Sequence, residues 1–455
     1  MESQHAFSDI PLRPRPHGCQ IPLTPMQLMQ WNYVNKQPGG WSIRLRAASI
    51  RVLGPLNAHA LEESIDAVVQ RHESLRTRIV RMEGILRQIV DTVKKYELEV
   101  VDLTGACRRE IEDAARQLAQ QFVEKRIDLS VGPLFGVKLL RLSSQEHVLI
   151  VGLDHIVTDG FSNGILNREI WARYNQVTQR TQTTLPALPV QFPDYAVWQE
   201  HTHNARRLKH QAFWQKQLNC ATSVEVPPDK GLIAGGSNVG VMLNLPFGKV
   251  ASDMLRDLSR RERILLPVAV MVAHLIVMSH WCGQAYLTVP FMSHGRHHRA
   301  ELQNMIGFLA VVLFIRIEIS KTERLIDLLR RLHVKFMSAI EHQEFAPELP
   351  EKFSTELLFN WGGLPGYSTR WSVGDLRTAA SALRIVPYPV RDPWSHKFLA
   401  LYSDSPAGIV ATVNYRPDLL ARGSVERFGE NLRTVTRELA SHPHARLESI
   451  ALTGG

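Results

Sequence analysis

The sequence predicts an α/β protein built from two lobes. Segments with helical periodicity alternate along the chain with short strand-like runs, a pattern typical of mixed α/β domains. The chain has 455 residues, 44% of them hydrophobic, so it can bury large cores and is too long for one ordinary domain. A Thr-, Gln- and Pro-rich stretch without periodicity, 178–193, is expected to link an N-terminal lobe, 1–177, to a C-terminal lobe, 194–455.

Two amphipathic helices are predicted in the first lobe. The first places on one face the side chains of Leu61, Ile65, Val68 and His72. The second lies in a segment of charged and Gln residues and carries on one face Ile111, Ala115, Leu118 and Phe122. Both patterns indicate helices that cover a sheet.

A β-hairpin follows, and its second strand ends at a histidine. The β-like runs 134–142 and 147–154 are separated by the polar turn 143–146. A buried strand would hold His155 rigidly, and imidazole exchanges a proton near neutral pH. Ser162 is expected to cap the next helix, which runs through Ile165, Ile170 and Tyr174, so that strand, loop and helix form one unit.

The second lobe contains three helix candidates. The apolar run 264–278 is interrupted by Pro267 and His274 and is shorter than the roughly 20 residues that cross a bilayer, so it indicates a buried helix. A capping box over 320–323 predicts a helix from Thr322 to Glu341. Ser424 is expected to cap a helix that ends at Ser441.

Composition favours a soluble cytoplasmic protein. The 53 Lys and Arg exceed the 44 Asp and Glu, and the net charge of +9 favours an acidic partner. Basic residues are not interleaved with exposed aromatic ones in any one segment, and none of the usual nucleic-acid motifs is present, so a nucleic-acid partner is not expected. The 4 cysteines form no Cys-x-x-Cys pair, and no secretory signal is present, so we expect no zinc site, disulfide framework or membrane partner.

Short motifs occur in order along nearly the whole chain. The first four are Pro22-Leu-Thr-Pro-Met-Gln27, Arg71-His-Glu-Ser-Leu-Arg-Thr77, Asp154-His-Ile-Val-Thr-Asp-Gly160 and Asp194-Tyr-Ala-Val-Trp198. They are followed by Gly295-Arg296, Ile306-Gly-Phe308, His342-Gln343 and Arg391-Asp392. The series resembles the condensation domains of nonribosomal peptide synthesis. One block departs from it, because Leu-Ala-Val stands at 309–311 where the family usually has a Val-Asn pair.

The resemblance implies a fold and a reaction. The fold is two chloramphenicol-acetyltransferase-like lobes in a V, with the signature histidine in a tunnel between them. The reaction joins an acyl group, carried by the phosphopantetheine arm of an acyl or peptidyl carrier protein, to a small-molecule acceptor. The enzyme needs no cofactor of its own. No adenylation, carrier or thioesterase domain is evident, so a free-standing, monomeric condensation enzyme is expected.

The resemblance also assigns roles to residues. His155 matches the catalytic histidine, which either removes the proton of the acceptor or steadies the tetrahedral intermediate. Asp159 matches the signature aspartate, which is held by an arginine; Arg296 is the first choice of partner and Arg76 the second. A buried carboxylate demands such a cation. The amide of Gly160 is expected to face the developing oxyanion.

Two further residues are candidates for binding the acceptor. Asp154 stands where the family usually has histidine. It either makes a local hydrogen bond, or it helps to recognise a cationic acceptor or raises the basicity of His155. Trp361 resembles a residue at the tunnel floor, with burial in the core as the alternative. His297-His298 is rejected as a metal site, because adjacent residues of a strand point apart and no further ligand completes a set.

Several functions stay open. Amide formation on a soluble amine is preferred, and ester formation on an alcohol is its close variant. An acyl-CoA-dependent acyltransferase shares the signature but tends to lack the second and fourth motifs. A non-catalytic recruitment module usually loses the histidine or the glycine, and this chain keeps both.

Overall fold

The computed structural model describes residues 11–35, 45–179, 185–219, 221, 223–229, 240–297, 299–345, 358–362, 383–387 and 397–454. The chain divides into two compact units, and each is discontinuous in sequence. The first contains Met1–Ala205, His294–Ala310 and Gly366–Arg391, and the second contains Arg206–Ser293, Val311–Pro365 and Asp392–Gly455.

This division differs from the two continuous lobes predicted from the sequence. The stretch 178–193 does not separate the units, because helix α5 (Phe192–Leu218) begins in the first unit and the division falls within that helix, after Ala205. Two later segments return to the first unit. Residues 294–310 do so through hydrogen bonds to the histidine loop, and strand β12 (Arg384–Pro387) does so by pairing with β2 (Leu45–Leu53).

The main sheet of the first unit contains the predicted hairpin. The strand order is β12-β2-β7-β6-β5, where β7 is Glu146–Asp154, β6 is Phe135–Ser143 and β5 is Glu99–Asp102. All neighbours are antiparallel except β5 and β6, which are parallel. Strand β7 is buried along almost its whole length, as expected for a strand covered on both faces.

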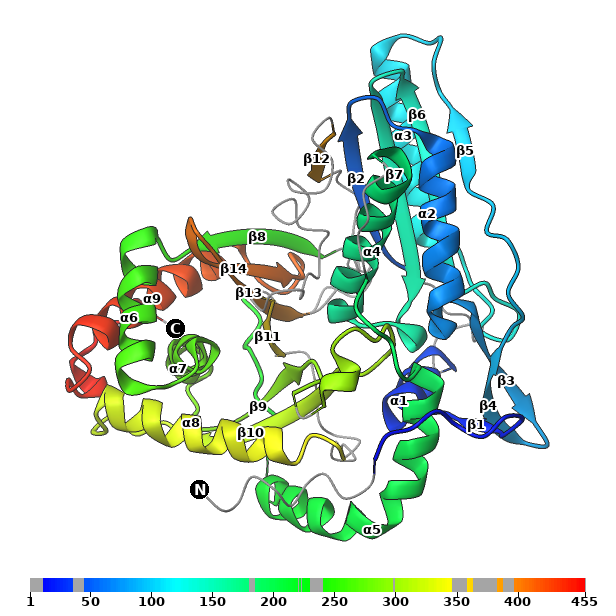
Figure 1. The fold of residues 1–455 in the computed structure, drawn as a ribbon. Helices are drawn as coiled ribbons and strands as arrows, with labels where there is room; N and C mark the ends of the chain where they lie inside the picture. Colours follow the sequence, from blue (N-terminus) through cyan, green and yellow to red (C-terminus); the bar gives the residue numbers. More distant parts are fainter. Residues whose placement is uncertain are drawn as a thin grey trace. The chain divides into compact units, whose positions relative to one another are not determined.

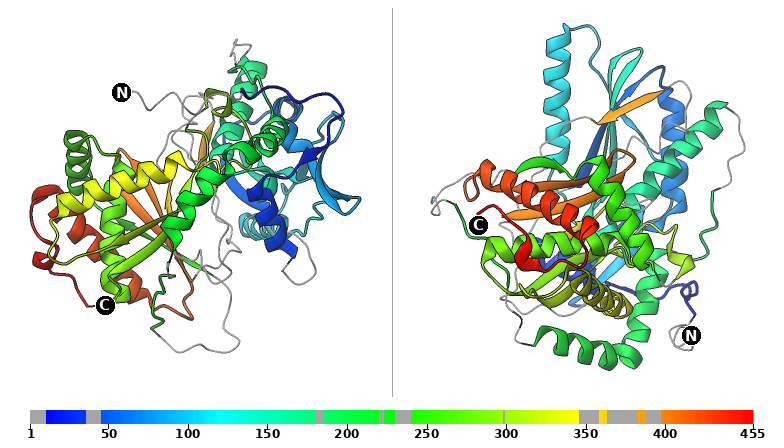
Figure 2. Two further views of the ribbon diagram at one scale, coloured as in Figure 1. Left: turned by 90° about the horizontal axis from the view of Figure 1, so that it is seen from below. Right: turned by 90° about the vertical axis from the view of Figure 1, so that its left-hand side faces the viewer.

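Helices cover both faces of this sheet (Figures 1 and 2). Helix α3 (Arg108–Glu124) packs on one face, where Ile111 and Ala115 join Val148 and Ile150 of β7 in one apolar cluster. Helix α2 (Ala58–Arg71) packs against α4 (Gly160–Gln179) on the opposite face. The predicted amphipathic helices and the strand–loop–helix unit are therefore confirmed.

A small sheet and helix α1 (Pro25–Asn35) lie beside the histidine loop. The sheet has the order β1-β4-β3, with β1 at Ile21–Pro22, β4 at Ile85–Val90 and β3 at Thr77–Met82. One buried apolar cluster joins this region to the loop, and it includes Leu23, Val34 and Ile79 together with Ile156 and Val157. The histidine loop therefore packs on apolar side chains from the first motif, helix α1 and strand β3.

The second unit is a sheet packed against helices. The strand order is β10-β9-β11-β13-β14-β8, at Val311–Glu318, Tyr286–Ser293, Phe359–Trp361, Phe398–Ser405, Gly408–Tyr415 and Val241–Pro246. Helix α7 (Leu266–Cys282) contacts α6 (Lys249–Glu262), α8 (Leu325–Glu341) and α9 (Arg422–Ser441).

The apolar run predicted as a buried helix is the core of α7. Residues 268–278 of this helix are all buried. Within the described part of the chain, no one helix has the length and apolar character to span a bilayer; α6 and α7 meet that test only as a pair, with a bend of 116° between them.

Three predicted helix caps differ from the observed ones. Helix α8 starts at Leu325 rather than Thr322, because the Glu323 carboxylate pairs with Arg331, 2.6 Å away, instead of closing a capping box. Helix α9 starts at Arg422, ahead of Ser424, whose hydroxyl accepts a hydrogen bond from Arg427. Helix α4 starts at Gly160, and the side chain that caps it is Asp159, not Ser162.

Candidate active site

Strand β7 delivers the histidine, and Asp154 shapes the turn that follows. Asp154 is the last residue of β7 and is fully buried. Its carboxylate Oδ1 accepts a hydrogen bond from the backbone N–H of Ile156 at 2.9 Å, which caps the short 3-10 helix His155–Val157. The local hydrogen bond that the sequence left as one of two possibilities for Asp154 is therefore present.

The His155 ring is held in one orientation and one tautomer. Its Nδ1 lies 2.7 Å from the carbonyl oxygen of Thr158. A carbonyl only accepts, so Nδ1 carries the hydrogen and the neutral ring presents the lone pair of Nε2. The ring packs against Phe308 with 4.4 Å between centroids and is only partly buried. This geometry leaves Nε2 as the basic atom.

Asp159 ties the loop to a distant segment of the first unit. It is fully buried, and its Oδ1 accepts from the backbone N–H and hydroxyl of Ser162, each at 2.8 Å. Its Oδ2 accepts from the backbone N–H groups of Leu309 and Ala310 at 3.0 and 2.9 Å. The carboxylate thus joins the start of α4 to the end of the segment 294–310.

The cationic partner of Asp159 is Arg296, as the first choice from the sequence predicted. Nη1 of Arg296 lies 2.9 Å from Oδ2 of Asp159, and both side chains are fully buried. Burial alone would raise the pKa of Asp159, but the Arg296 charge and the hydrogen bonds outweigh it and lower that pKa. The second choice, Arg76, instead donates to the carbonyl of Asp91 and lies 3.9 Å from Glu73.

Arg296 is itself held on several sides. It donates to the carbonyls of His294 and Met305 at 2.8 and 3.1 Å and to the Ser162 hydroxyl at 3.0 Å. Its guanidinium lies 4.7 Å from the centroid of the Phe161 ring. A buried ion pair stabilises a structure only when further hydrogen bonds satisfy its remaining polar groups. These contacts engage Nη1 and Nη2, whereas the buried Nε has no hydrogen-bond partner among the described residues.

Two motif glycines permit close packing around this pair. Gly295 has φ +72, and a Cβ there would lie 1.9 Å from the carbonyl oxygen of Leu309. A Cβ at Gly307 would lie 2.2 Å from the Phe192 ring. A side chain at either position would displace the segment that holds Asp159.

Gly160 and Trp361 lie in different units. Gly160 is buried and is the first residue of α4, where the opening backbone N–H groups of a helix lack partners within it. Trp361 belongs to the second unit, where it is 8% exposed and pairs in parallel register with Tyr402 of β13. Its burial within a sheet agrees with the packing alternative raised for it.

The sequence missed His294 and Ser162 as parts of the site. His294 Nδ1 accepts from the backbone N–H of Arg296 at 3.2 Å, and its ring lies 5.1 Å from that of Phe161. Burial, then the charges of His297 and Arg296, lower the pKa of His294 to about 3, so the ring is neutral at physiological pH. The three-residue spacing from Asp159 to Ser162 was the available signal for Ser162.

The structure describes one of the two adjacent histidines that were rejected as a metal site. His297 is exposed and its ring lies 3.9 Å from that of His294, whereas His298 lies outside the described residues, as does Arg391-Asp392. Within the described ranges, no group of three or more His, Cys, Asp or Glu side chains is arranged to hold a metal ion.

The second motif makes a buried contact with helix α4. His72 Nε2 lies 2.9 Å from the carboxylate of Glu169, a buried residue of α4. The second motif is thereby fixed to the helix that starts directly after the histidine loop.

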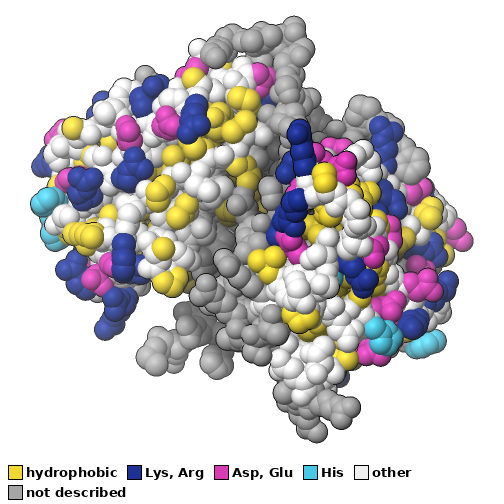
Figure 3. All heavy atoms as spheres, turned by 90° about the horizontal axis from the view of Figure 1, so that it is seen from above, with side chains coloured by type: hydrophobic (Ala, Val, Ile, Leu, Met, Phe, Trp, Pro, Cys, Tyr) yellow, Lys and Arg dark blue, Asp and Glu magenta, His cyan; other side chains and the backbone are white. Residues whose placement is uncertain are grey.

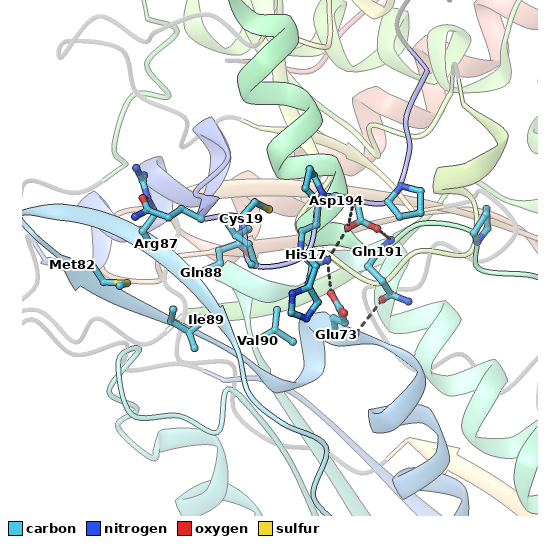
Figure 4. Close-up of a pocket in the computed structure, with 17 residues that line it drawn as sticks. His17, Cys19, Glu73, Met82, Arg87, Gln88, Ile89, Val90, Gln191 and Asp194 are labelled. Carbon is cyan, nitrogen blue, oxygen red and sulfur yellow. Dashed lines mark hydrogen bonds and ion pairs between the residues drawn. The ribbon is translucent and has the colours of Figure 1, made fainter.

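A cavity lies where the second and fourth motifs meet. Glu73 and Asp194 both pair with Arg15, at 2.9 and 2.7 Å (Figure 4). Arg15, Glu73 and Asp194 line a cavity of about 650 Å³ between the segment 14–21 and strand β4, and Gln88 lies in its wall.

The basic surplus of the chain is dispersed on the face drawn in Figure 3. Lys and Arg side chains stand there among Asp, Glu and apolar side chains rather than in one continuous patch. Several basic side chains of the protein are paired, including Arg256 with Asp404 and Arg330 with Glu262. The net charge of +9 is therefore not gathered into one patch on this face.

Comparisons with known proteins match this arrangement to one family. The family model described as Condensation domain matches residues 19–350. The chain is 27% identical over 470 residues to chondramide synthase cmdD of Chondromyces crocatus, an alignment that covers 99% of this chain and 12% of that protein. It is also 27% identical over 449 residues to phosphinothricin tripeptide synthetase PhsC of Streptomyces viridochromogenes, with coverage of 97% and 41%. The chain thus spans less than half the length of these curated relatives.

Solved structures share the fold. The X-domain from teicoplanin biosynthesis superimposes with a TM-score of 0.80 and 19% identity over 98% of this chain and 100% of that one. The same domain in complex with OxyB gives 0.79 at 19% identity, with coverage of 98% and 99%. SgcC5 from Streptomyces globisporus gives 0.71 at 19% identity, with coverage of 93% and 100%.

Proposed function

Because the chain belongs to the condensation-domain family, we propose that it transfers an acyl or aminoacyl group from a carrier-protein thioester to a soluble amine and forms an amide in specialised-metabolite biosynthesis. The observation that carries the proposal is the His155 loop, which holds a basic Nε2 in a fixed ring orientation. The enzyme uses no cofactor of its own, and the phosphopantetheine arm arrives with the carrier protein.

The proposed step follows from that geometry. The amine nitrogen attacks the thioester carbonyl, a C–N bond forms, and the C–S bond then breaks. His155 Nε2 accepts the proton that the amine nitrogen loses, and that proton passes to the departing thiolate, so the products are an amide and the free thiol of the arm. The Gly160 amide stabilises the oxyanion, and the tunnel expected from the resemblance keeps water from competing.

The intact loop supports catalysis over recruitment. The likeness to an X-domain extends to the fold, and the complex of that domain with OxyB makes recruitment of a second protein the alternative to test. A recruitment module has no need of a fixed histidine, yet here Asp159, Arg296 and Ser162 form a buried network that holds the histidine loop. We therefore assign a reaction to this site.

Ester formation is the second candidate. SgcC5, which shares the fold, was solved with (R)-(-)-1-(2-naphthyl)-1,2-ethanediol, a diol. A hydroxyl can give its proton to Nε2 just as an amine can. An acyl-CoA-dependent transfer is the third candidate, and the motifs at 71–77 and 194–198 favour a carrier protein over it.

The setting of the reaction is part of the proposal. Acyl carrier proteins are commonly acidic, so the net charge of +9 would steer one to this enzyme. We propose a cytoplasmic monomer that binds neither nucleic acid nor membrane. Asp154 and Trp361 are the proposed contacts of the acceptor pocket.

The test is intact-mass turnover of an acyl-loaded carrier protein with a panel of soluble amines and alcohols. His155→Ala should abolish acceptor-dependent unloading, while His59→Ala, which removes an exposed histidine of the same unit, should retain it. A carrier that binds but is never unloaded would favour recruitment. Consumption of acyl-CoA with the carrier ignored would favour the acyltransferase.

A further inference from the structure

Two glutamines are buried beside the histidine loop. Gln27, from the first motif, is 0% exposed, and Gln88 of β4 is 1% exposed. A buried amide is costly unless its hydrogen-bonding groups are satisfied, so both side chains have a structural or functional reason to be there.

The two side chains form a chain of hydrogen bonds that ends on the loop. Gln27 Nε2 donates to the carbonyl oxygen of Ile156 at 2.9 Å and to Gln88 Oε1 at 3.2 Å. Gln88 Nε2 in turn donates to the carbonyl oxygen of Pro22 at 2.7 Å. The Oε1 atom of Gln27 accepts from the backbone N–H of Thr24 at 3.0 Å, which fixes the orientation of its amide.

The bond to Ile156 completes the restraint of the loop. Asp154 holds the N–H of this residue, and Gln27 holds its carbonyl. The His155 ring depends on the Thr158 carbonyl, two residues further along the same turn. A rotation of the peptide after Ile156 would therefore move the acceptor that fixes the tautomer of His155.

We propose that Gln27 is a positioning residue that keeps His155 in its reactive tautomer by anchoring the Ile156 carbonyl, with Gln88 supporting Gln27. The inference rests on the proposed function only for its effect on turnover. It does not require Gln27 to contact either substrate.

The test compares the same substitution at the two glutamines. Gln27→Glu keeps the acceptor for Thr24 but replaces the donor to Ile156 with an oxygen, whereas Gln88→Glu keeps the acceptor for Gln27 and leaves the bond to Ile156 intact. Both introduce one buried carboxyl group, so Gln88→Glu is the matched control for burying that group.

We expect Gln27→Glu to lower kcat by about 10²-fold with KM little changed, the scale of loss that misplacement by about 1 Å produces. Gln88→Glu should lose much less. Relative to the wild type at the same pH, turnover of Gln27→Glu should recover partly at lower pH, because burial raises the pKa of a carboxyl group and its protonated form can donate to the Ile156 carbonyl.

A second readout does not depend on turnover. Nitrogen-15 NMR of the histidine rings, with the His155 signals assigned by their absence in His155→Gln, should show hydrogen on Nδ1 in the wild type and in Gln88→Glu, and a mixture of tautomers in Gln27→Glu. If Gln27→Glu does not fold, Gln27→Met, which lacks both the donor and the charge, is measured in the same way.

The outcomes separate the two proposals. An unchanged His155 tautomer in a folded Gln27 variant overturns the positioning role, and so do equal losses of kcat in the two glutamate variants. A wild type that unloads no carrier contradicts the proposed reaction, while a shifted tautomer in the Gln27 variant would still support the positioning role.

Discussion

Buried polar groups are treated differently in the two units. In the first unit, the full charges of Asp159 and Arg296 are buried together and joined by hydrogen bonds to several backbone groups. In the second, His274 of α7 is buried among aromatic rings, with Tyr402 Oη 2.7 Å from its Nδ1. Burial lowers the pKa of His274 to about 3, so this ring stays neutral. The buried pair that fixes the loop is therefore charged, whereas the buried histidine in the core of the second unit is neutral.

Removing the cation of the buried pair in the first unit should have the largest effect. Arg296→Met leaves Asp159 buried without its partner, which typically costs about 3–5 kcal/mol. We expect urea unfolding to show a loss of that size, together with loss of turnover. The double variant Asp159→Asn/Arg296→Met should recover part of the stability, and a double variant no more stable than the single one would contradict this account.

Acid should destabilise the protein through the buried histidine of the second unit. The folded pKa of His274 is about 3 and the ordinary value is 6.5, so the unfolded state binds more protons between these two values. Its contribution to stability is fully present above pH 6.5 and is lost as the pH falls towards 3, by up to about 1.4 kcal/mol per pH unit.

The check is urea unfolding from pH 7 to pH 4 for the wild type and His274→Leu. The variant should be less stable at pH 7, because Tyr402 loses its partner, yet its stability should fall less steeply with acid. Parallel pH profiles would show that His274 is not the source. His294, whose pKa is also about 3, should contribute a similar slope in both proteins.

Asp154 is a further buried carboxylate of the first unit, and it holds a turn through a backbone N–H group. Asp154→Ala removes the cap on the N–H of Ile156, and loss of such a cap costs about 1 kcal/mol. Asp154→His tests acceptor recognition: if Asp154 only caps the turn, acceptor preference is unchanged. A changed preference for cationic amines in the turnover panel would establish the binding role.

The smallest effect is expected at the surface of the first unit. Hydrogen bonding to Arg108, opposed by burial and reinforced by Arg51, lowers the pKa of Glu146 to about 2. Arg108 is 60% exposed, so solvent screens the pair, and Glu146→Gln should cost about 0.2–1 kcal/mol. The cost should shrink as salt is added, and a salt-independent loss of several kcal/mol would place this pair with the buried charges instead.

The local parts of the site could be predicted from the sequence, and the distant parts could not. The apolar run before His155 and the polar turn ahead of it predicted the hairpin and the rigid placement of the ring. The Asp159–Arg296 pair was predicted from the resemblance, in which an arginine holds the signature aspartate, and a buried carboxylate requires such a cation. The amides of Leu309 and Ala310 left no such signal, because any residue except proline supplies an N–H group.

The errors have related causes. Ser162 and Glu323 suit helix caps by residue type, but partners elsewhere in the fold engage both side chains. The continuous lobes were wrong in detail because strand pairing between β2 and β12 joins segments far apart in the sequence, such as Ile50 and Pro387, which no local periodicity reveals.

The bond between Asp159 and Ala310 has a consequence for synthesis of the chain. The two residues are separated by 151 positions, and Arg296 follows Asp159 by 137. During translation the histidine loop therefore leaves the ribosome well before the groups that neutralise its aspartate. Contacts so distant in sequence form late and slowly. A nascent chain stalled before residue 296 would carry His155 without the Asp159–Arg296 ion pair, so the histidine loop would reach its final geometry only after residues 296–310 had been made.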